Sequence, residues 1–338
     1  MSETELAVAG RVDDSAVGES APVLLIKAKG GFGNRILAAT TGIILAELTG
    51  RTAVIDWREG GYAAPGVNAY PLLFEDPVGV PISAFDDRVD VTPALWSGRV
   101  GESVWDLMEE RDPKDHTSPF AYRRYSLDLA RPAAPNKLAV FWSYLPKTAR
   151  ITAQVRRTPR FRGMTLDDVT RRALDRYFRP NPRVRAEVDR VFTGREHPII
   201  GVHIRYTDRK VSLGRIFREV TRLRKRMPEA AIFLATDNAR VQAEFCARFD
   251  DVFVIDKALG DDENSLHEKV VLDDQLREAE NALIDMWSLA RCDWLVHSRH
   301  STFSVAAAQI GGIPTSRQRD VDRWNARVVL KRWFQRWA

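Results

Sequence analysis

The sequence has little cysteine and no long apolar run. Its 338 residues include two cysteines, and no apolar stretch approaches the ~20 residues that span a membrane as a helix. Two cysteines are too few for a disulfide framework or a zinc site, which favours reduced thiols in a cytoplasmic protein. Residues 1–20 carry five acidic side chains and one arginine, without the basic start and apolar stretch of a signal peptide. We predict that they form a disordered lead.

Several motifs of phosphate and metal chemistry are missing as well. The absence of GxxxxGK[ST] excludes P-loop NTPases, and the absence of GxSxG argues against a serine hydrolase. No HExxH or paired CxxC sequence suggests a zinc site. The one Asp-x-Asp sequence, Asp320 to Asp322, lies in the C-terminal tail without a predicted strand before it. It therefore does not predict the metal–diphosphate site of divalent-metal glycosyltransferases.

The excess of basic charge is found at one end of the chain. The formal net charge is +5, and residues 316–338 alone hold seven basic and two acidic side chains. A basic tail says little about the partners of the body, so nucleic acid is not an expected partner. Apolar side chains among these arginines predict an amphipathic terminal helix that packs back on the body. They are Trp324, Val328, Trp333, Phe334 and Trp337. Membrane-surface contact through 316–338, or a non-catalytic module that binds nucleic acid or anionic lipid, is the alternative.

The periodicity of apolar residues indicates two α/β units. An apolar run at 23–26 precedes a glycine-rich turn, a helical pattern that ends at Gly50 and a strand at 52–56. A second series alternates strands at 199–204, 231–235, 252–255 and 294–296 with helices at 213–226, 239–248, 273–290 and 303–310. This alternation predicts an α/β fold of two Rossmann-like domains facing each other across a cleft. The predicted segments are 21–195, 196–315 and the terminal helix at 316–338, and residues 57–146 show no pattern that assigns their topology.

A glycine-rich loop joins the first strand to the first helix. Its sequence, from Lys29 to Arg35, lets backbone N–H groups approach a phosphate or sugar. A dinucleotide fingerprint needs a further glycine where this sequence has Ile36, although Asp56 stands where a ribose-binding acid would fall. An NAD-type oxidoreductase is therefore an alternative, and so is a turn needed only for packing.

Polar side chains follow the strands of the second series, where open α/β sheets bind ligands. Arg205 follows the strand at 199–204, and its guanidinium suits bidentate contact with phosphate oxygens. Thr236, Asp237 and Asn238 end the next strand in the same way. His203 lies within its strand, where a packing histidine is as good an interpretation as a ligand contact.

Two helical segments carry further candidates. Asp285 lies on an apolar helix face, where a carboxylate needs either an ion-pair partner or a ligand. The segment from Ser301 to Ser304 opens a helix, and its hydroxyl and N–H groups suit an anion as well as a plain N-cap.

Together these pieces resemble the α-1,6-fucosyltransferase and protein O-fucosyltransferase superfamily, most closely the bacterial NodZ nodulation fucosyltransferases. The N-terminal resemblance covers residues 31–35 and 49–58. The C-terminal resemblance covers residues 203–205, 235–238, 282–286, 288–293 and 301–304, in the expected order. Each motif is short, and their order and spacing carry the resemblance.

The resemblance implies a GT-B fold and an inverting, metal-independent transferase that uses GDP-fucose without a cofactor. Residues 196–315 would bind the GDP-sugar, and residues 21–195 would face a glycan or other hydroxyl-bearing acceptor. Arg205 would be the catalytic residue that holds the β-phosphate, because leaving GDP accumulates negative charge. The implied substrate-binding residues are Gly31, Phe32, Gly33, Asn34, Arg35, His203, Thr236, Asp237, Asn238, Asp285, Ser301, Thr302, Phe303 and Ser304. Among them His203 would contact the nucleotide, Asp285 the guanine, and Ser301 to Ser304 the diphosphate.

The chain departs from the vertebrate-type pattern at two points. A second arginine beside Arg205 is replaced by Tyr206, and the glutamate base a few residues further on has no counterpart. Asp208 is our candidate for the catalytic base, with Asp56 or Glu59 of the opposite domain in reserve. A different GDP-sugar would fit the same nucleotide contacts, and the acceptor is chosen by loops within 60–180 that carry no motif.

Overall fold

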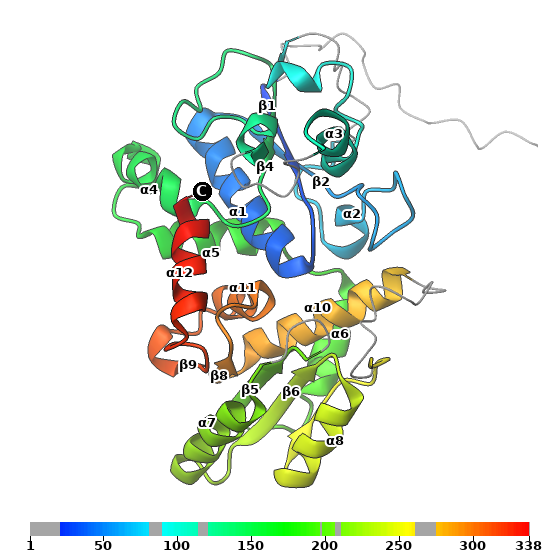
Figure 1. Ribbon diagram of the computed structural model, residues 1–338, viewed down its shortest axis with the longest axis vertical. Helices are drawn as coiled ribbons and strands as arrows, with labels where there is room; N and C mark the ends of the chain where they lie inside the picture. The colour runs from blue at the N-terminus through cyan, green and yellow to red at the C-terminus, as the bar shows by residue number, and fades with distance from the viewer. Residues whose placement is uncertain are drawn as a thin grey trace, which may run out of the picture.

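The computed structural model describes residues 21–80, 90–113, 121–196, 198–206, 211–260 and 275–337. Two parallel sheets form the centres of two α/β halves, one above the other in Figure 1. The chain therefore has the GT-B architecture, as the sequence predicts. Among the described residues, no helix combines the length and the apolar character needed to cross a membrane.

The N-terminal sheet has the strand order β2-β1-β4-β3. Strand β1 (Val23–Lys27) pairs in parallel with β2 (Thr52–Asp56) and with β4 (Leu138–Trp142), and β4 also pairs with β3 (Val91–Thr92). All five residues of β1 are buried, since helices cover both faces of a parallel sheet. Helix α1 (Phe32–Thr49) joins β1 to β2 and ends at Gly50, whose φ of 67° suits glycine.

The region that the sequence left unassigned contributes two of these strands. Strand β4 is a buried apolar run, LAVFW. No helical pattern precedes it closely, so the sequence does not show the strand–helix alternation that identifies the other parallel strands. The same half contains helices α2 (Tyr70–Leu73), α3 (Val104–Arg111), α4 (Thr148–Arg157) and α5 (Leu166–Tyr177). Helix α6 (Pro182–Val191) lies with the C-terminal half, against α10. Short 3-10 turns occur at Ala94–Trp96, Ala121–Tyr125 and Pro159–Phe161.

The C-terminal sheet has the strand order β7-β6-β5-β8-β9. Its strands are β5 (Ile199–Ile204), β6 (Ala231–Thr236), β7 (Val252–Phe253), β8 (Trp294–His297) and β9 (Gln318–Asp320). Its helices are α7 (Leu213–Arg226), α8 (Ala239–Arg248), α10 (Gln275–Arg291) and α11 (Thr302–Ile310). The predicted strands and helices of this half are confirmed, with β7 shorter than expected.

The tail differs from the prediction of one helix over 316–338. A 3-10 turn at Thr315–Arg317 leads into β9, which pairs in parallel with β8, and helix α12 covers only Ala326–Trp337. Strand β9 is a half-buried polar edge strand, so it has no apolar run that sequence inspection could find. The Asp-x-Asp sequence therefore does follow a strand, contrary to the prediction. Helix α12 packs against α4 of the N-terminal half.

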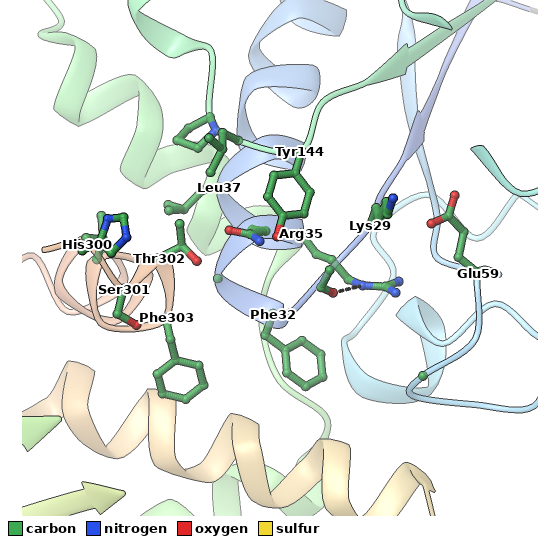
Figure 2. Close-up of a pocket in the computed structure, with 18 of the residues that line it drawn as sticks. Lys29, Phe32, Arg35, Leu37, Glu59, Tyr144, His300, Ser301, Thr302 and Phe303 are labelled. Carbon is green, nitrogen blue, oxygen red and sulfur yellow. Dashed lines mark hydrogen bonds between the residues drawn. The ribbon is translucent and has the colours of Figure 1, made fainter. Parts of the chain in front are cut away.

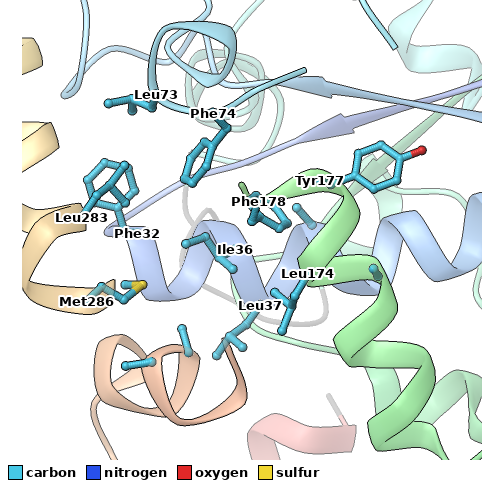
Figure 3. Packing of buried hydrophobic residues seen from close by; sticks show 14 of the residues in the cluster. Phe32, Ile36, Leu37, Leu73, Phe74, Leu174, Tyr177, Phe178, Leu283 and Met286 are labelled. Carbon is cyan, nitrogen blue, oxygen red and sulfur yellow. The ribbon is translucent and has the colours of Figure 1, made fainter. Parts of the chain in front are cut away.

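One hydrophobic cluster joins the two halves. Figure 3 shows Phe32, Ile36 and Leu37 of α1 between Leu283 and Met286 of α10 on one side and residues of α5 on the other. Helix α1 also packs against α11 of the C-terminal half, and so does α5. The N-terminal end of α1 is consequently held against the C-terminal half, which places the glycine-rich loop at the boundary between the sheets.

Candidate functional site

A cleft of about 1860 Å³ lies between the two halves. Its N-terminal wall consists of residues 29–35 and parts of 58–66, 101–106 and 144–149. Its C-terminal wall includes Arg205, Val211 and residues 298–303, and α12 contributes Val328, Val329 and Trp333. Figure 2 shows the residues of α11 and of the glycine-rich loop facing each other across it.

The glycine-rich loop serves both packing and the cleft. Gly31 is the N-cap of α1 and, as a glycine, supplies no side-chain cap, while the N–H of Phe32 bonds to Tyr62. Gly31 and Phe32 both line the cleft. Gly33 lies directly against the backbone of Thr302 and Phe303, where a Cβ atom would overlap both. The packing alternative is thus correct for Gly33, while Gly31, Phe32, Asn34 and Arg35 line the cleft with it.

Arg35 is a buried cation at the floor of this loop. Its Nε donates to the carbonyl of Gly30 at 2.8 Å, and its guanidinium lies 4.9 Å from the ring centroid of Tyr62. Its Nη1 atom is buried and has no hydrogen-bond partner in the described part of the chain. A buried guanidinium nitrogen without a partner is costly, so this atom is suited to an anionic ligand in the cleft.

The N-terminus of α11 faces the same space. Ser301 is its N-cap residue, but its side chain accepts no capping bond, and its hydroxyl is buried without a partner among the described residues. Ser301, Thr302 and Phe303 line the cleft. Ser304 instead turns inward, where its hydroxyl lies 2.9 Å from Nδ1 of His297. The site therefore uses the first turn of α11 through Ser301 to Phe303, and Ser304 supports that turn from behind.

Arg205 reaches the cleft from the end of β5. Its charge acts on the phenol of Tyr62 across the cleft, although burial dominates and raises the pKa of that phenol. The next residue, Tyr206, donates its backbone N–H to Asp237 at 2.8 Å, so Asp237 holds the segment that carries Arg205. Asp208, our candidate base, lies outside the described residues.

Three other candidates lie behind the cleft wall. Thr236 and Asn238 are buried, and the Asn238 side chain accepts from the N–H of Val241 as the N-cap of α8. Together with Asp237 they form the turn after β6 and are not among the residues lining the cleft.

His203 and Asp285 form a buried group behind Phe303. The His203 ring stacks on Phe303 with centroids 5.1 Å apart, and burial lowers the pKa of His203 to about 3. Asp285 forms an ion pair with Lys257, while its Oδ1 atom is buried without a partner in the described residues. Burial raises the pKa of Asp285, and Lys257 opposes this. Phe303 thus separates this polar group from the open cleft.

Several cleft residues were missed from the sequence or kept only in reserve. Glu59 lines the cleft and accepts the N–H of Val104 at 2.8 Å, and burial raises the pKa of Glu59. The Lys29 ammonium lies over the ring of Trp105, and burial lowers the pKa of Lys29 to about 8. Arg299 and Tyr144 also line the cleft. Lys29 begins the predicted glycine-rich loop but was not selected from it, and Glu59 follows β2. Both lie near the carboxyl ends of parallel strands, where α/β sheets bind ligands.

Asp56 is not available to a ribose. It is buried, and its carboxylate forms ion pairs with Lys27 and Arg58, each at 2.8 Å. Its pKa is lowered because these two cations outweigh burial. The acid that supported a dinucleotide site is thus a structural ion-pair partner, which argues against the NAD-type alternative.

The Asp-x-Asp carboxylates also have structural partners. Asp320 accepts the N–H groups of Arg299 and Asp322, and Asp322 accepts the hydroxyl of Ser298 at 2.5 Å. Within the described ranges, no three His, Cys, Asp or Glu side chains gather as a metal site requires. The two aspartates therefore tie β9 to the loop that precedes α11.

Comparison with known proteins relates this architecture to one group of enzymes. The family model "Nodulation protein Z (NodZ)" matches residues 164–331. Nodulation protein Z of Bradyrhizobium diazoefficiens is 24% identical over 300 residues, covering 79% of this chain and 72% of its own length. Nodulation protein Z of Sinorhizobium fredii is 22% identical over 345 residues, covering 91% and 96%. The crystal structure of NodZ α-1,6-fucosyltransferase soaked with GDP-fucose superimposes with a TM-score of 0.60 at 24% identity, covering 86% of this chain and 92% of that one.

Proposed function

We propose that this chain, a NodZ-like glycosyltransferase of the fucosyltransferase superfamily, transfers L-fucose from GDP-fucose to a hydroxyl group of a glycan or other acceptor. The relatives supply the class of enzyme. The identity of the donor, the inversion of configuration and the independence from metal are our proposals for this chain.

One observation carries the donor proposal: two helix N-termini and two arginines meet at the cleft. The first turns of α1 and α11 both line the cleft with the positive end of a helix dipole, although the N–H of Phe32 is bonded to Tyr62. Arg205 lines the cleft from one half, and Arg35 offers an unpartnered Nη1 atom from the other. A diphosphate is the ligand whose charge and oxygen atoms match this set of donors.

The buried group behind Phe303 supplies a second argument, for a guanine base. A guanine edge carries adjacent N–H donors, and the Oδ1 atom of Asp285 is an acceptor without a partner among the described residues. Burial raises the pKa of this carboxylate and the ion pair with Lys257 opposes that shift, while the lowered pKa of His203 keeps the ring neutral. We place the guanine near His203 and Asp285, with Phe303 moving or stacking at the boundary. Thr236, Asp237 and Asn238 shape this end of the site from behind.

Charge compensation without a metal follows from the same arrangement. As the acceptor oxygen attacks the anomeric carbon, the bond to the phosphate oxygen breaks and its electron pair leaves with GDP. The developing negative charge is stabilised by Arg205, and Arg35 replaces the cation lost where Tyr206 stands. Attack from the side opposite the leaving group inverts the anomeric configuration.

The proton of the acceptor hydroxyl needs a base on the acceptor side. Glu59 lies on the N-terminal wall, and Figure 2 shows it beyond Arg35 and Lys29 from the α11 residues. Its raised pKa is closer to neutrality than that of an ordinary glutamate, which suits proton transfer. We therefore assign the base to Glu59. Asp56 is excluded by its two ion pairs, and Asp208 lies outside the described residues.

GDP binding and turnover test the proposal separately. We expect millimolar GDP to raise the melting temperature, and GDP-fucose with an acceptor mixture to release GDP and yield a product heavier by one deoxyhexose. GDP-mannose is the matched control for the sugar, and UDP is the matched control for the base. Stabilisation by UDP equal to that by GDP would refute guanine recognition. Faster turnover of GDP-mannose than of GDP-fucose would show that fucose is not the sugar transferred.

A further inference from the structure

The surface around α12 concentrates exposed apolar side chains. Six large apolar side chains are exposed in the described part of the chain, and four of them lie between residues 324 and 333: Trp324, Val329, Leu330 and Trp333. Trp324 is 85% exposed and Leu330 67%. The other two, Val67 and Leu72, belong to the N-terminal half, away from the tail in sequence. Exposed apolar side chains gathered in one segment indicate an interaction surface.

The sequences of α12 and of the neighbouring α4 segment are rich in basic residues. Residues 148–162, which form α4 and the turn after it, contain five arginines and no acidic residue. Residues 326–337 of α12 contain four basic residues and no acidic residue. Helix α12 packs against α4, as Figure 1 shows, so the two basic segments adjoin. Their nine positive charges exceed the +5 of the whole chain, which leaves the remainder net acidic.

We propose that this α12 surface docks on an anionic lipid bilayer. It is formed by Trp324, Arg327, Val329, Leu330 and Trp333 together with Arg156 and Arg157 of α4. Exposed arginines are attracted to anionic headgroups, and neighbouring tryptophan and leucine side chains enter the boundary between headgroups and acyl chains. Arg160 of the α4 segment pairs with Glu47 and is not part of the proposed surface. Arg156, Arg157 and Arg327 are exposed. Charge complementarity and exposed apolar groups therefore occur together, as interfacial binding requires.

The apolar side chains favour lipid over nucleic acid as the partner. A nucleic acid uses arginines for its phosphates and aromatic rings for stacking, so it would engage Trp324 and Trp333. The exposed aliphatic side chains of Val329 and Leu330 have no base to stack on, whereas acyl chains would cover them. Positions 329 and 330 lie one helical turn before 333, so these three side chains share one side of α12.

Docking in this way would bring the cleft to the membrane. Val328, Val329 and Trp333 also line the cleft, so α12 forms both the docking surface and one edge of the site. An acceptor displayed at the lipid surface would then meet the cleft directly. The docking itself does not depend on the identity of the donor or the sugar.

Vesicle sedimentation with the full-length chain tests this proposal. The chain is mixed with vesicles of phosphatidylcholine alone and of phosphatidylcholine with phosphatidylglycerol, and the bound fraction is measured at low and high salt. We expect binding to the vesicles that contain phosphatidylglycerol, reduced by salt. Trp324→Ala/Leu330→Ala and Arg156→Glu/Arg157→Glu should each weaken binding about tenfold or more. Neither pair includes a residue that lines the cleft.

Matched variants separate docking from general effects. Leu72→Ala removes an exposed apolar side chain elsewhere, and Lys225→Glu/Arg226→Glu reverses two charges at the end of α7. Both should bind vesicles as the unaltered chain does, and circular dichroism should show that all variants are folded. Absence of binding to anionic vesicles would overturn the proposal, as would equal binding to phosphatidylcholine alone. It would also fail if Trp324→Ala/Leu330→Ala bound normally, or if single-stranded RNA bound more tightly than vesicles.

Discussion

Gly33 of α1 lies against the backbone of Thr302 at the start of α11, so that the two helices meet without a side chain between them. This contact brings two helix N-termini from separate sheets to one cleft. The glycine in the loop motif is thus required by the approach of α11, and the meeting of the two helix N-termini at the cleft is a consequence of that approach.

Substitution of Gly33 should therefore destabilise the protein. A Cβ atom in Gly33→Ala would overlap backbone atoms of Thr302 and Phe303, which cannot rotate away as a side chain could. We expect the free energy of unfolding, measured in urea, to fall by about 1–3 kcal/mol. Gly214→Ala in the first turn of α7 is the control, since that position is open. Its stability should be unchanged or raised by up to about 1 kcal/mol. Equal stability of the two variants would contradict the packing role.

Loss of the Arg205 guanidinium should impair catalysis more than folding. Arg205 lines the cleft and, in our proposal, stabilises charge on the departing GDP. Arg205→Ala should lower kcat by about 10²–10³-fold, and Arg205→Lys should recover part of it. GDP release measures the rate, and thermal unfolding measures the fold. Arg222→Ala on the exposed side of α7 should behave as the unaltered chain does, since Arg222 pairs only with Glu219 among the described residues.

Much of the fold could be predicted because the C-terminal half obeys simple patterns. Its buried strands are short apolar runs, and the apolar residues of α7 recur at helical spacing among basic ones. The ends of these elements therefore follow from the sequence. Strand β9 could not be found this way, because a polar edge strand is specified by its pairing with β8. Strand β4 was missed because the chain between β2 and β4 has no regular α/β alternation.

The sequence predicts which loops form the candidate site, but not which of their polar side chains face the cleft. Residues after parallel strands share one edge of a sheet, which identifies Arg205 and the glycine-rich loop. The same rule selected Thr236 and Asn238, whose polar groups cap the local turn and helix instead. Only the folded chain shows that Asp56 is paired while nearby Glu59 faces the cleft. The charge state of these carboxylates depends on tertiary neighbours, which no spacing in the sequence encodes.

Chelation of divalent metals should leave activity intact. In our proposal guanidinium groups and helix N-termini compensate the diphosphate charge, so no cation is required at the leaving group. GDP formation should be equal in EDTA and in added magnesium or manganese. Chromatographic measurement of GDP avoids coupling enzymes that need metals themselves. Loss of activity in EDTA, with recovery on adding one metal, would refute this part of the proposal.

His203 should make the protein less stable in mild acid. Burial, assisted by the nearby charges of His297, Arg205 and Lys257, lowers the pKa of His203 from 6.5 to about 3. Between these values the unfolded chain binds a proton that the folded chain does not, so stability from this residue falls as pH drops from 6.5 towards 3. The unfolding free energy of His203→Gln should depend less on pH over this range. Identical slopes for the two proteins would show that His203 already carries a proton when folded.

Glu59 should control the acidic limb of the pH–rate profile. Burial raises the pKa of Glu59, and a base works only when ionised, so kcat/KM should rise with pH through a midpoint above 4.5. Glu59→Gln should lose about 10²–10⁴-fold in kcat and lack this limb, while its thermal stabilisation by GDP is retained. Glu102→Gln is the control, because Glu102 lines the same cleft but pairs with Arg99. If the Glu59→Gln enzyme keeps the acidic limb, Glu59 is not the base and Asp208 becomes the candidate. Asp208→Asn should then abolish both the acidic limb and turnover.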